Sequence, residues 1–541
     1  MKASDLFIKI LENKWVETIY GVPGEENLDL LDSISRSSIE LVLTRNEQTA
    51  VFMAATYGRF TGKPGVALAT LWPGATNMMT GVAYAQLGGL PLIVITGQKP
   101  QNKSKQGAFQ IIDVVGMMKP VTKWTTSIVS GARIPYILEN AFRITEDEKP
   151  GAVHLELPED IAGEEVEEKY SLVDLGTQKI RRPVVDYKWI PLLITEIQKA
   201  SSPIILIGSG ANRKRITKYL TKFIETHNIP YFTSQMGKWV VAGRQENYLG
   251  TAALTSGDYI HDAIAESDLI LSVGYDNVEK PTDILGINGI PVININFVKS
   301  NFDYVYSPYL DIIGDIANVF WNLCEAEIDS SNWNFEKIYE INKRNQKQIE
   351  DNLLLEDSFS YMMPRKLAKD LREILNDEDI LTLDNGLYKV WLARNYPARK
   401  PNTILLDNAL ATMGAGYASA MEAKRLNPDS NVVCVTGDGG LVMNLWDIET
   451  AVRLKLDMVI VVLNNSSYGM IQWKQKGAGF ADFWLDFWNP DFCKLAESFW
   501  AKGYKVEKKE DFKGVLEKSL KEKWLTIIDL DFGYPEDGEI K

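Results

Sequence analysis

Short apolar runs alternate along the chain with stretches of helical periodicity. In the first part, residues 39–44 (IELVLT), 66–70 (VALAT) and 92–96 (LIVIT) are apolar, and amphipathic stretches run from Glu47 to Phe60 and onward from Ala75. Strands that are buried on both faces read as nearly continuous apolar runs, and the helices between them cover the two faces of a parallel sheet. The pattern therefore predicts parallel βαβ units and an α/β fold.

The same rhythm returns in two further blocks of the chain. The apolar runs are 204–208, 230–234, 268–274 and 291–297 in the second block, and 380–386, 403–408, 431–440 and 457–465 in the third. A chain of 541 residues suits about three domains. We expect three doubly wound parallel-sheet domains at residues 1–165, 188–330 and 360–541, with a charged linker at 164–182 and a charge-rich stretch at about 326–358. The first and third blocks share one rhythm, which suggests two similar folds on either side of a Rossmann-like middle domain.

Composition narrows the class of protein. Hydrophobic residues make up 45% and charged residues 24%, and the net charge is −14 with no basic stripe, which argues against nucleic acid as a partner. No apolar run reaches the ~20 residues of a membrane span, and the N-terminus has no apolar signal region. Cys324, Cys434 and Cys493 are far apart, which argues against a disulfide framework or a cysteine zinc site. We expect a cytoplasmic protein.

One glycine-rich turn is a weak signal. Gly208-Ser-Gly210 resembles the start of a dinucleotide-binding fingerprint, but Arg213 stands where the third glycine would be. A broken motif of this kind does not predict NAD.

The strongest candidate for chemistry is the segment Gly437-Asp438-Gly439-Gly440. It follows the apolar run 432–435, and 26 residues, including a helical stretch at about 442–454, separate Asp438 from Asn465 at the end of the next run. Two parallel strands joined in this way place Asp438 and Asn465 side by side at the carboxyl ends of the sheet, where α/β folds bind ligands. Glycines let the backbone approach a diphosphate, and a carboxylate, an amide oxygen and a backbone carbonyl, for which Ser467 is well placed, suit Mg²⁺. The alternative is a plain Gly-Asp-Gly turn, which the strands and the spacing disfavour.

On these residues the sequence resembles the large subunits of thiamine-diphosphate-dependent acetolactate (acetohydroxyacid) synthases, because GDGG…NN is the thiamine diphosphate motif of that superfamily. Similar segments extend over nearly the whole chain. They are GVPGEEN (21–27), RNEQ (45–48), PGATN (73–77), AFQ (108–110), ATMGAG (411–416), ETAVRL (449–454) and YGMIQW (468–473). The resemblance implies pyrimidine-binding, middle and diphosphate-binding domains, and an enzyme that decarboxylates a 2-oxo acid.

The resemblance implies catalytic roles for three residues. Glu47 matches the glutamate that hydrogen-bonds the aminopyrimidine ring, through which the C2 proton of the thiazolium is removed. Taken alone, a glutamate at a helix start is usually a partner of the helix dipole. Met413 matches the apolar residue that holds the cofactor bent, although it could otherwise be a core methionine. Gln110 matches a position on the substrate side.

The resemblance also implies a wider set of contacts. The cofactor-binding positions would be Pro23, Glu47, Pro73, Asn77, Leu387, Tyr388, Ala411, Met413, Gly437, Asp438, Gly439, Gly440, Asn465, Ser467, Tyr468, Gly469 and Met470. The Mg²⁺ ligands would be Asp438, Asn465 and Ser467. The substrate pocket would contain Glu25, Trp72, Phe109, Gln110, Ile471 and Trp473. Because different subunits hold the two ends of the cofactor in this superfamily, we expect a homodimer or homotetramer with active sites at the subunit interface.

Several residues depart from the family pattern. Asn46 stands where a histidine usually precedes the glutamate, Trp72 replaces the usual glycine, and Ile111 replaces a glutamate. Leu387 and Tyr388 replace a polar pair that commonly touches the diphosphate. The segment 21–27 also looks somewhat like the GVPGD-type loop of 2-oxo acid decarboxylases, which would bring Glu25 near the reacting carbon, but the paired histidines of those enzymes are absent.

Trp473 and the segment GYDNVEKP (274–281) are more similar to the catabolic branch of the family, which has no FAD. We therefore expect thiamine diphosphate and Mg²⁺ as cofactors and no bound flavin. Trp72 and Trp473 would narrow the donor pocket, although both could equally be core aromatic residues.

Three functions stay open at this point. The leading one is the joining of two pyruvate molecules into 2-acetolactate with release of CO₂. The second is decarboxylation of a 2-oxo acid to an aldehyde, or carboligation with another donor or acceptor, and Glu25 and Trp72 motivate it. The third is a cofactor-binding protein without turnover, which the presence of Glu47, Asp438 and Asn465 disfavours.

Overall fold

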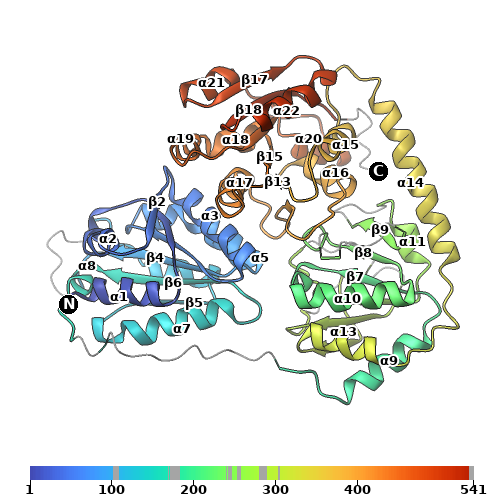
Figure 1. Cartoon of the computed structure of the whole chain (residues 1–541), viewed down its shortest axis with the longest axis horizontal. Helices are drawn as coiled ribbons and strands as arrows, with labels where there is room; N and C mark the ends of the chain where they lie inside the picture. Colours follow the sequence, from blue (N-terminus) through green and yellow to red (C-terminus); the bar gives the residue numbers. More distant parts are fainter. Residues whose placement is uncertain are drawn as a thin grey trace.

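The computed structural model contains three parallel sheets of six strands each, with helices packed on both faces (Figure 1). It describes residues 1–101, 109–167, 170, 183–238, 240–241, 246–252, 258–279, 285, 289–301 and 305–534. The predicted α/β class with three parallel-sheet domains is confirmed. None of the described helices combines the length and the apolar character that a membrane crossing requires.

The first sheet has the strand order β2-β1-β3-β4-β6-β5. Its strands are β1 (Thr18–Gly21), β2 (Glu40–Leu43), β3 (Gly65–Ala69), β4 (Leu92–Gln98), β5 (Trp124–Ser127) and β6 (Ala152–Pro158). Its helices are α1 (Ala3–Asn13), α2 (Leu28–Ser35), α3 (Glu47–Thr61), α4 (Gly74–Asn77), α5 (Met79–Gly88), α6 (Val114–Met118), α7 (Ile134–Glu146) and α8 (Glu159–Ala162). Strands β3 and β6 are buried along their whole length, as the continuous apolar runs predict for strands with both faces covered.

The middle sheet has the order β12-β11-β10-β7-β8-β9, which is the order of the Rossmann fold. Its strands are β7 (Pro203–Ile207), β8 (Tyr231–Thr233), β9 (Tyr248–Thr251), β10 (Leu269–Val273), β11 (Val292–Asn296) and β12 (Leu310–Ile313). Its helices include α9 (Trp189–Lys199), α10 (Lys214–His227), α11 (His261–Ala265) and α13 (Ile316–Glu325).

The third sheet has the order β14-β13-β15-β16-β18-β17, which repeats the order of the first sheet. Its strands are β13 (Ile380–Leu383), β14 (Ile404–Leu405), β15 (Val432–Gly437), β16 (Val459–Asn464), β17 (Lys502–Val506) and β18 (Thr526–Asp531). Its helices are α15 (Pro364–Ile374), α16 (Leu387–Asn395), α17 (Ala415–Leu426), α18 (Asp438–Met443), α19 (Ile448–Arg453), α20 (Gly469–Gly477), α21 (Phe492–Ser498) and α22 (Phe512–Lys521). The shared order agrees with the expectation of two similar folds around a different middle domain.

The charge-rich stretch 326–358 contains a long helix, α14 (Glu336–Glu356), which the sequence reading treated only as a separator. The helix runs past the middle domain toward the third domain (Figure 1). Ile338 packs into the core of the middle domain, and near the other end of α14 Glu356 accepts a hydrogen bond from Arg365 at 2.6 Å. The stretch therefore connects two domains as a helix. Most of the expected linker at 164–182 lies outside the described residues.

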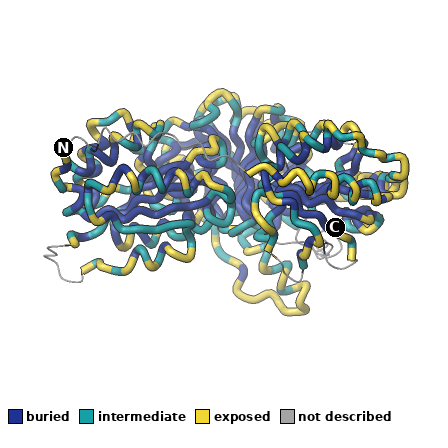
Figure 2. Tube along the Cα trace, turned by 90° about the horizontal axis from the view of Figure 1, so that it is seen from below, coloured by how far each residue is buried: buried dark blue, intermediate teal, exposed yellow. Residues whose placement is uncertain are grey.

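The first and third domains share one apolar core in which α3 packs against α17, and the buried part of the chain continues across the centre of the molecule (Figure 2). Thr56 Oγ1 donates a hydrogen bond to Ser419 Oγ at 3.1 Å where the helices cross. Arg59, further along α3, donates to the carbonyl of Leu406 at 3.1 Å, ahead of the start of α17. Glu47 lies nine residues from Thr56, about 14 Å of helix, on the side away from Leu406.

Three of the tryptophans that the structure describes have left-handed backbone conformations. The φ angles are +63° at Trp15, +53° at Trp484 and +61° at Trp500, and the side chains are 74%, 88% and 72% exposed. A positive φ is an outlier for a bulky residue, whereas glycine adopts it without steric cost. These positions combine backbone strain with an apolar side chain in solvent.

Candidate active site

The residues expected to form the site follow the carboxyl ends of equivalent strands in the two outer domains. In the first domain, β1 precedes Pro23 and Glu25, β2 precedes Glu47, β3 precedes Trp72, Pro73 and Asn77, and β4 precedes Phe109 and Gln110. In the third domain, β13 precedes Leu387 and Tyr388, β14 precedes Ala411 and Met413, β15 precedes Asp438, and β16 precedes Asn465, Ser467 and Tyr468. The repeated strand order thus supplies both groups from the same four places in a sheet.

These residues differ in exposure. Pro23, Glu25, Trp72, Pro73, Asn77, Phe109, Ala411, Tyr468 and Ile471 are exposed. Glu47, Gln110, Met413, Gly437, Gly439, Asn465, Ser467, Gly469, Met470 and Trp473 are half-buried, and Leu387, Tyr388, Asp438 and Gly440 are buried.

In the first domain, the structure brings Glu47 and Asn77 together. Glu47 is the first residue of α3, and its Oε2 accepts a hydrogen bond from Asn77 Nδ2 at 2.9 Å. Asn46, the unusual residue before it, caps the helix by accepting a hydrogen bond from the backbone N–H of Gln48 at 2.8 Å. A Cβ atom at Gly74 would lie 3.2 Å from Glu47 Oε1, so this glycine leaves room beside the carboxylate.

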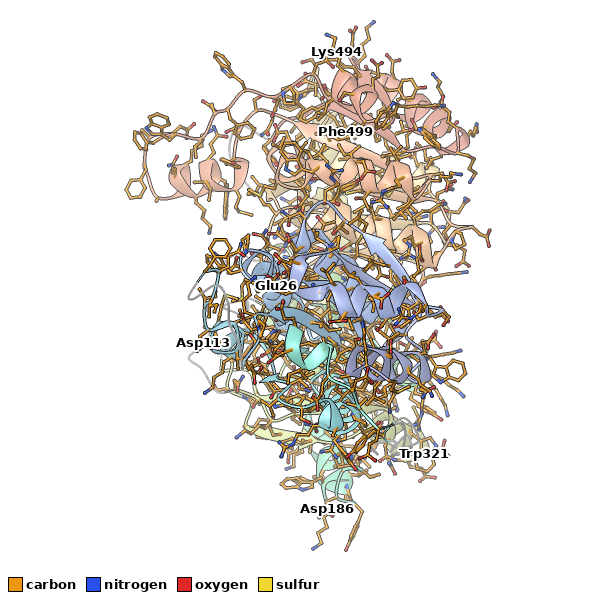
Figure 3. All side chains as sticks on the ribbon, turned by 90° about the vertical axis from the view of Figure 1, so that its left-hand side faces the viewer. Glu26, Asp113, Asp186, Trp321, Lys494 and Phe499 are labelled. Atoms are coloured by element: carbon orange, nitrogen blue, oxygen red, sulfur yellow. The ribbon has the colours of Figure 1, made fainter. Side chains whose placement is uncertain are left out.

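The sequence reading singled out Glu25 but missed the next residue. Glu26 is buried in the 3₁₀ turn η1 (Glu25–Asn27), and its carboxylate pairs with the buried Lys99 at 2.5 Å. Burial acts to raise the pKa of Glu26, but hydrogen bonds from Lys99 and Thr70 outweigh it and hold the pKa below its usual value. Glu26 follows β1, and Asp113 lies in the segment after β4; Figure 3 shows both toward the same side of the first domain.

In the third domain, Asp438 and Asn465 are in contact. Asp438 Oδ2 accepts hydrogen bonds from the backbone N–H groups of Asn465 at 3.1 Å and Ser466 at 2.6 Å. The crossover differs from the single helix expected at 442–454. Helix α18 begins at Asp438 itself, and the 3₁₀ turn η6 (Leu445–Asp447) separates it from α19, so Gly439 and Gly440 lie in the first turn of a helix.

Asn489 is a residue of this cluster that sequence reasoning missed. Its Nδ2 donates to Asp438 Oδ2 at 2.8 Å and to Asn464 Oδ1 at 2.9 Å. The segment before it pairs with the end of the β16 loop, through a bridge between Ser467 and Asp486. Asn489-Pro490 reads as a turn signal in the sequence, but nothing local reveals that the turn folds back onto Asp438.

The residues that replace the usual polar pair are both buried at the start of α16. Tyr388 accepts a hydrogen bond at its hydroxyl from the backbone N–H of Gly437 at 2.9 Å, and burial raises its pKa well above the usual value. Leu387 belongs to a small apolar cluster with Met470 and Trp473 of α20. The structure therefore places residues of α16 between the glycine turn and α20.

The local geometry fits a diphosphate with Mg²⁺. A Cβ atom at Gly440 would lie 2.2 Å from Asp384 Oδ2, so the turn leaves no space for a side chain there. The hydroxyl of Ser467 is buried and lacks a hydrogen-bond partner in the described residues. The described part of the chain has no cluster of three or more His, Cys, Asp or Glu side chains that could hold a metal. A metal at Asp438 would therefore take amide, carbonyl and phosphate oxygens, which are the ligands that Mg²⁺ prefers.

A cavity of about 1120 Å³ lies between the first and middle domains, and the Gly208-Ser-Gly210 turn lines it. The N–H of Gly208 donates to the carbonyl of Val273 at 2.9 Å, and that of Gly210 to the carbonyl of Gly274 at 2.8 Å. Two N–H groups of this turn are thus used within the sheet edge and do not form a phosphate-binding cradle. The ion pair between Lys149 and Asp276, at 2.5 Å, joins the two domains at the cavity wall.

Comparison with known proteins identifies all three domains. Models described as thiamine pyrophosphate enzyme match residues 1–117 (N-terminal TPP binding domain), 191–323 (central domain) and 384–530 (C-terminal TPP binding domain). A probable acetolactate synthase large subunit of Methanococcus aeolicus is 31% identical over 96% of this chain and 90% of its own. An acetolactate synthase of Bacillus subtilis is 29% identical over 99% and 94% of the two chains. A catabolic acetolactate synthase of Raoultella terrigena is 27% identical over 99% and 95%.

Proposed function

Because this chain belongs to the thiamine-diphosphate-dependent acetolactate synthase family, we propose that it joins two pyruvate molecules into 2-acetolactate with release of CO₂. The proposal rests on two groups of residues at the carboxyl ends of the strands, one group in each outer domain. Glu47 contacts Asn77 in the first domain, and Asp438 contacts the Asn465 loop in the third. By the family resemblance, these groups would contact the two ends of thiamine diphosphate.

Thiamine diphosphate would supply, when bound, the carbon nucleophile and the electron sink that decarboxylation of a 2-oxo acid needs. Asp438, Asn465 and the carbonyl of Ser467 would hold Mg²⁺, and the glycine turn 437–440 lets the diphosphate approach. Glu47 would hydrogen-bond the pyrimidine ring and exchange a proton there. Met413 and the carbonyl of Ala411 would orient that ring.

We propose that each site is shared between two chains, in a homodimer or homotetramer. The proposal rests on the family resemblance, because different subunits hold the two ends of the cofactor in that superfamily. Within this chain, Glu47 lies about 14 Å of helix from Thr56, where α3 contacts α17. A second copy that offers its Glu47 to this Met413 completes the site.

We also propose that the enzyme is cytoplasmic, binds no flavin and is of the catabolic type. The hydrogen bonds of the 208–210 turn and the ion pair at the cavity wall support a middle domain that serves as a connector. The segment 274–281, which motivated this prediction, is described only as far as residue 279. A flavin absorption spectrum in the purified protein would contradict the proposal.

A second candidate is release of the aldehyde. Trp72 is 40% exposed at the strand end beside Pro73, and Glu25 is exposed at the neighbouring strand end. A large side chain and a carboxylate at this edge favour protonation of the two-carbon unit over entry of a second 2-oxo acid.

The products of one incubation separate these functions. The purified protein is incubated with thiamine diphosphate, Mg²⁺ and pyruvate, and acetolactate (as acetoin after acid treatment) and acetaldehyde are measured together. Acetolactate as the main product is the expected result. Acetaldehyde alone would identify a decarboxylase. If neither acetolactate nor acetaldehyde formed, pyruvate would be excluded as the substrate. Omission of Mg²⁺ and the Glu47→Gln variant serve as controls.

A further inference from the structure

The loop between β14 and α17, residues 406–414, carries both Ala411 and Met413. Its shape depends on the carboxylate of Asp407 at its start. Oδ1 of Asp407 accepts a hydrogen bond from the N–H of Ala409 at 2.9 Å, and Oδ2 accepts one from the N–H of Ala411 at 2.7 Å. Ala411 has a positive φ of +55°, so this hydrogen bond holds it in a conformation that it would otherwise seldom adopt.

A second buried carboxylate holds the other end of the loop. Asp384, just after β13, accepts hydrogen bonds from the N–H groups of Gly414 at 2.9 Å and Gly416 at 3.1 Å. Thr436, one residue before the glycine turn, donates its hydroxyl to the same carboxylate at 3.1 Å. The loop that contains Ala411 and Met413 is therefore held by hydrogen bonds to Asp407 at its start and to Asp384 at its end.

Lys389 of α16 connects the 406–414 loop to the segment that follows β13. Its side chain is 3% exposed, and its Nζ donates to Asn385 Oδ1 at 2.6 Å, to the carbonyl of Asp407 at 2.6 Å and to Asn408 Oδ1 at 3.3 Å. Asn385 in turn donates to the carbonyl of Thr412 at 2.7 Å, between Ala411 and Met413. An ammonium group has three protons, and all three are used here.

The charge of Lys389 matters because the carboxylates around it are buried. Burial lowers the pKa of Lys389 to about 8, and Asp407, Asp384 and Glu279 act to raise it, so the group is an ammonium at neutral pH. Arg59 of α3 is a further cation that faces Asp407. Removal of the Lys389 ammonium would leave the negative charge of the buried carboxylates without part of its balancing positive charge. An uncompensated buried charge destabilises the folded protein.

We propose that Lys389 is a positioning residue that sets the geometry of the 406–414 loop and thereby the affinity of the chain for thiamine diphosphate. It acts through the loop and does not touch the reacting atoms. The proposal rests on the cofactor and is independent of which product is formed.

Lys389→Met tests the proposal, with Lys424→Met as a matched control. Lys424 is likewise 3% exposed and belongs to the same domain, but its Nζ donates to the carbonyls of Pro428 and Ser430, near the C-terminal end of α17. We expect Lys389→Met to raise the Kd and the KM for thiamine diphosphate by about tenfold or more, with little change in the KM for pyruvate. Lys389→Arg should restore part of the affinity. The Kd is measured by cofactor titration of the apoprotein, followed by tryptophan fluorescence.

The control separates positioning from general destabilisation. Lys424→Met should lower the stability but leave the Kd within about twofold of the unchanged protein, because it is remote from the loop. An unchanged Kd in Lys389→Met, or an equal loss in Lys424→Met, would overturn the proposal. If Lys389→Met does not fold, Asn385→Ala, which removes the side chain that connects Lys389 to the carbonyl of Thr412, is titrated in the same way with the same expected loss. Failure of the unchanged protein to bind the cofactor would instead contradict the proposed function.

Discussion

The two outer domains have the same strand order but hold their functional carboxylates differently. In the first domain, Glu47 is half-buried at a helix start, and its contact with Asn77 is between side chains. In the third domain, Asp438, Asp384 and Asp407 each accept hydrogen bonds from two or more backbone N–H groups. Backbone hydrogen bonds fix an ionised carboxylate in place. One topology thus supplies a carboxylate held by a side chain in one domain and carboxylates held by the backbone in the other.

The largest effect should come from Glu47→Gln. The variant keeps the size of the side chain and its contact with Asn77 but cannot exchange a proton, so turnover should fall by about 10²–10⁴-fold. Binding of thiamine diphosphate, measured by fluorescence titration, should change little. In contrast, Asp438→Asn should abolish Mg²⁺-dependent cofactor binding. Near-normal turnover in Glu47→Gln would remove the proposed distinction between the two domains.

A medium effect should come from Glu422, where the two domains join. Burial raises the pKa of Glu422 to about 7, against hydrogen bonds from Arg425 and from Tyr20 of the first domain. Because its folded pKa exceeds the ordinary 4.5, folding favours the protonated form, and this stabilisation is present at low pH and lost as pH rises through 7. Glu422→Gln should match the unchanged protein near pH 5 and exceed its free energy of unfolding by about 1–3 kcal/mol at pH 8. Denaturant titrations at both pH values measure this, and an equal difference at both would contradict it.

The smallest effect concerns a feature that both domains share. Trp15 lies in the first domain, and Trp484 and Trp500 lie in the third, all with positive φ and exposed side chains. Replacement of each by glycine should raise the free energy of unfolding by about 1 kcal/mol, because glycine removes the strain of the left-handed conformation. Trp391, which is 2% exposed, is the control, and Trp391→Gly should cost about 3–5 kcal/mol. A loss of stability in all three exposed variants would refute the role of backbone strain.

The separation in sequence between interacting residues decides how much of the fold and of the candidate site could be predicted. The apolar runs and the spacing of Asp438 and Asn465 are local signals, and they predicted the sheets and one half of the site. Glu47 could be chosen only through the family resemblance. Asn489, Lys389 and Asp407 escaped notice because a buried lysine or a turn asparagine has no local pattern that separates it from a surface residue. Their partners lie up to 51 positions away in the sequence, as with Asn489 and Asp438, so only the tertiary fold reveals them.

The three strained tryptophans have a further consequence for how the sequence can vary. Glycine at positions 15, 484 and 500 would adopt the left-handed conformation without steric cost, whereas glycine at the buried position 391 would leave a cavity. The backbone therefore favours replacement of tryptophan by glycine at single positions and opposes it in the core.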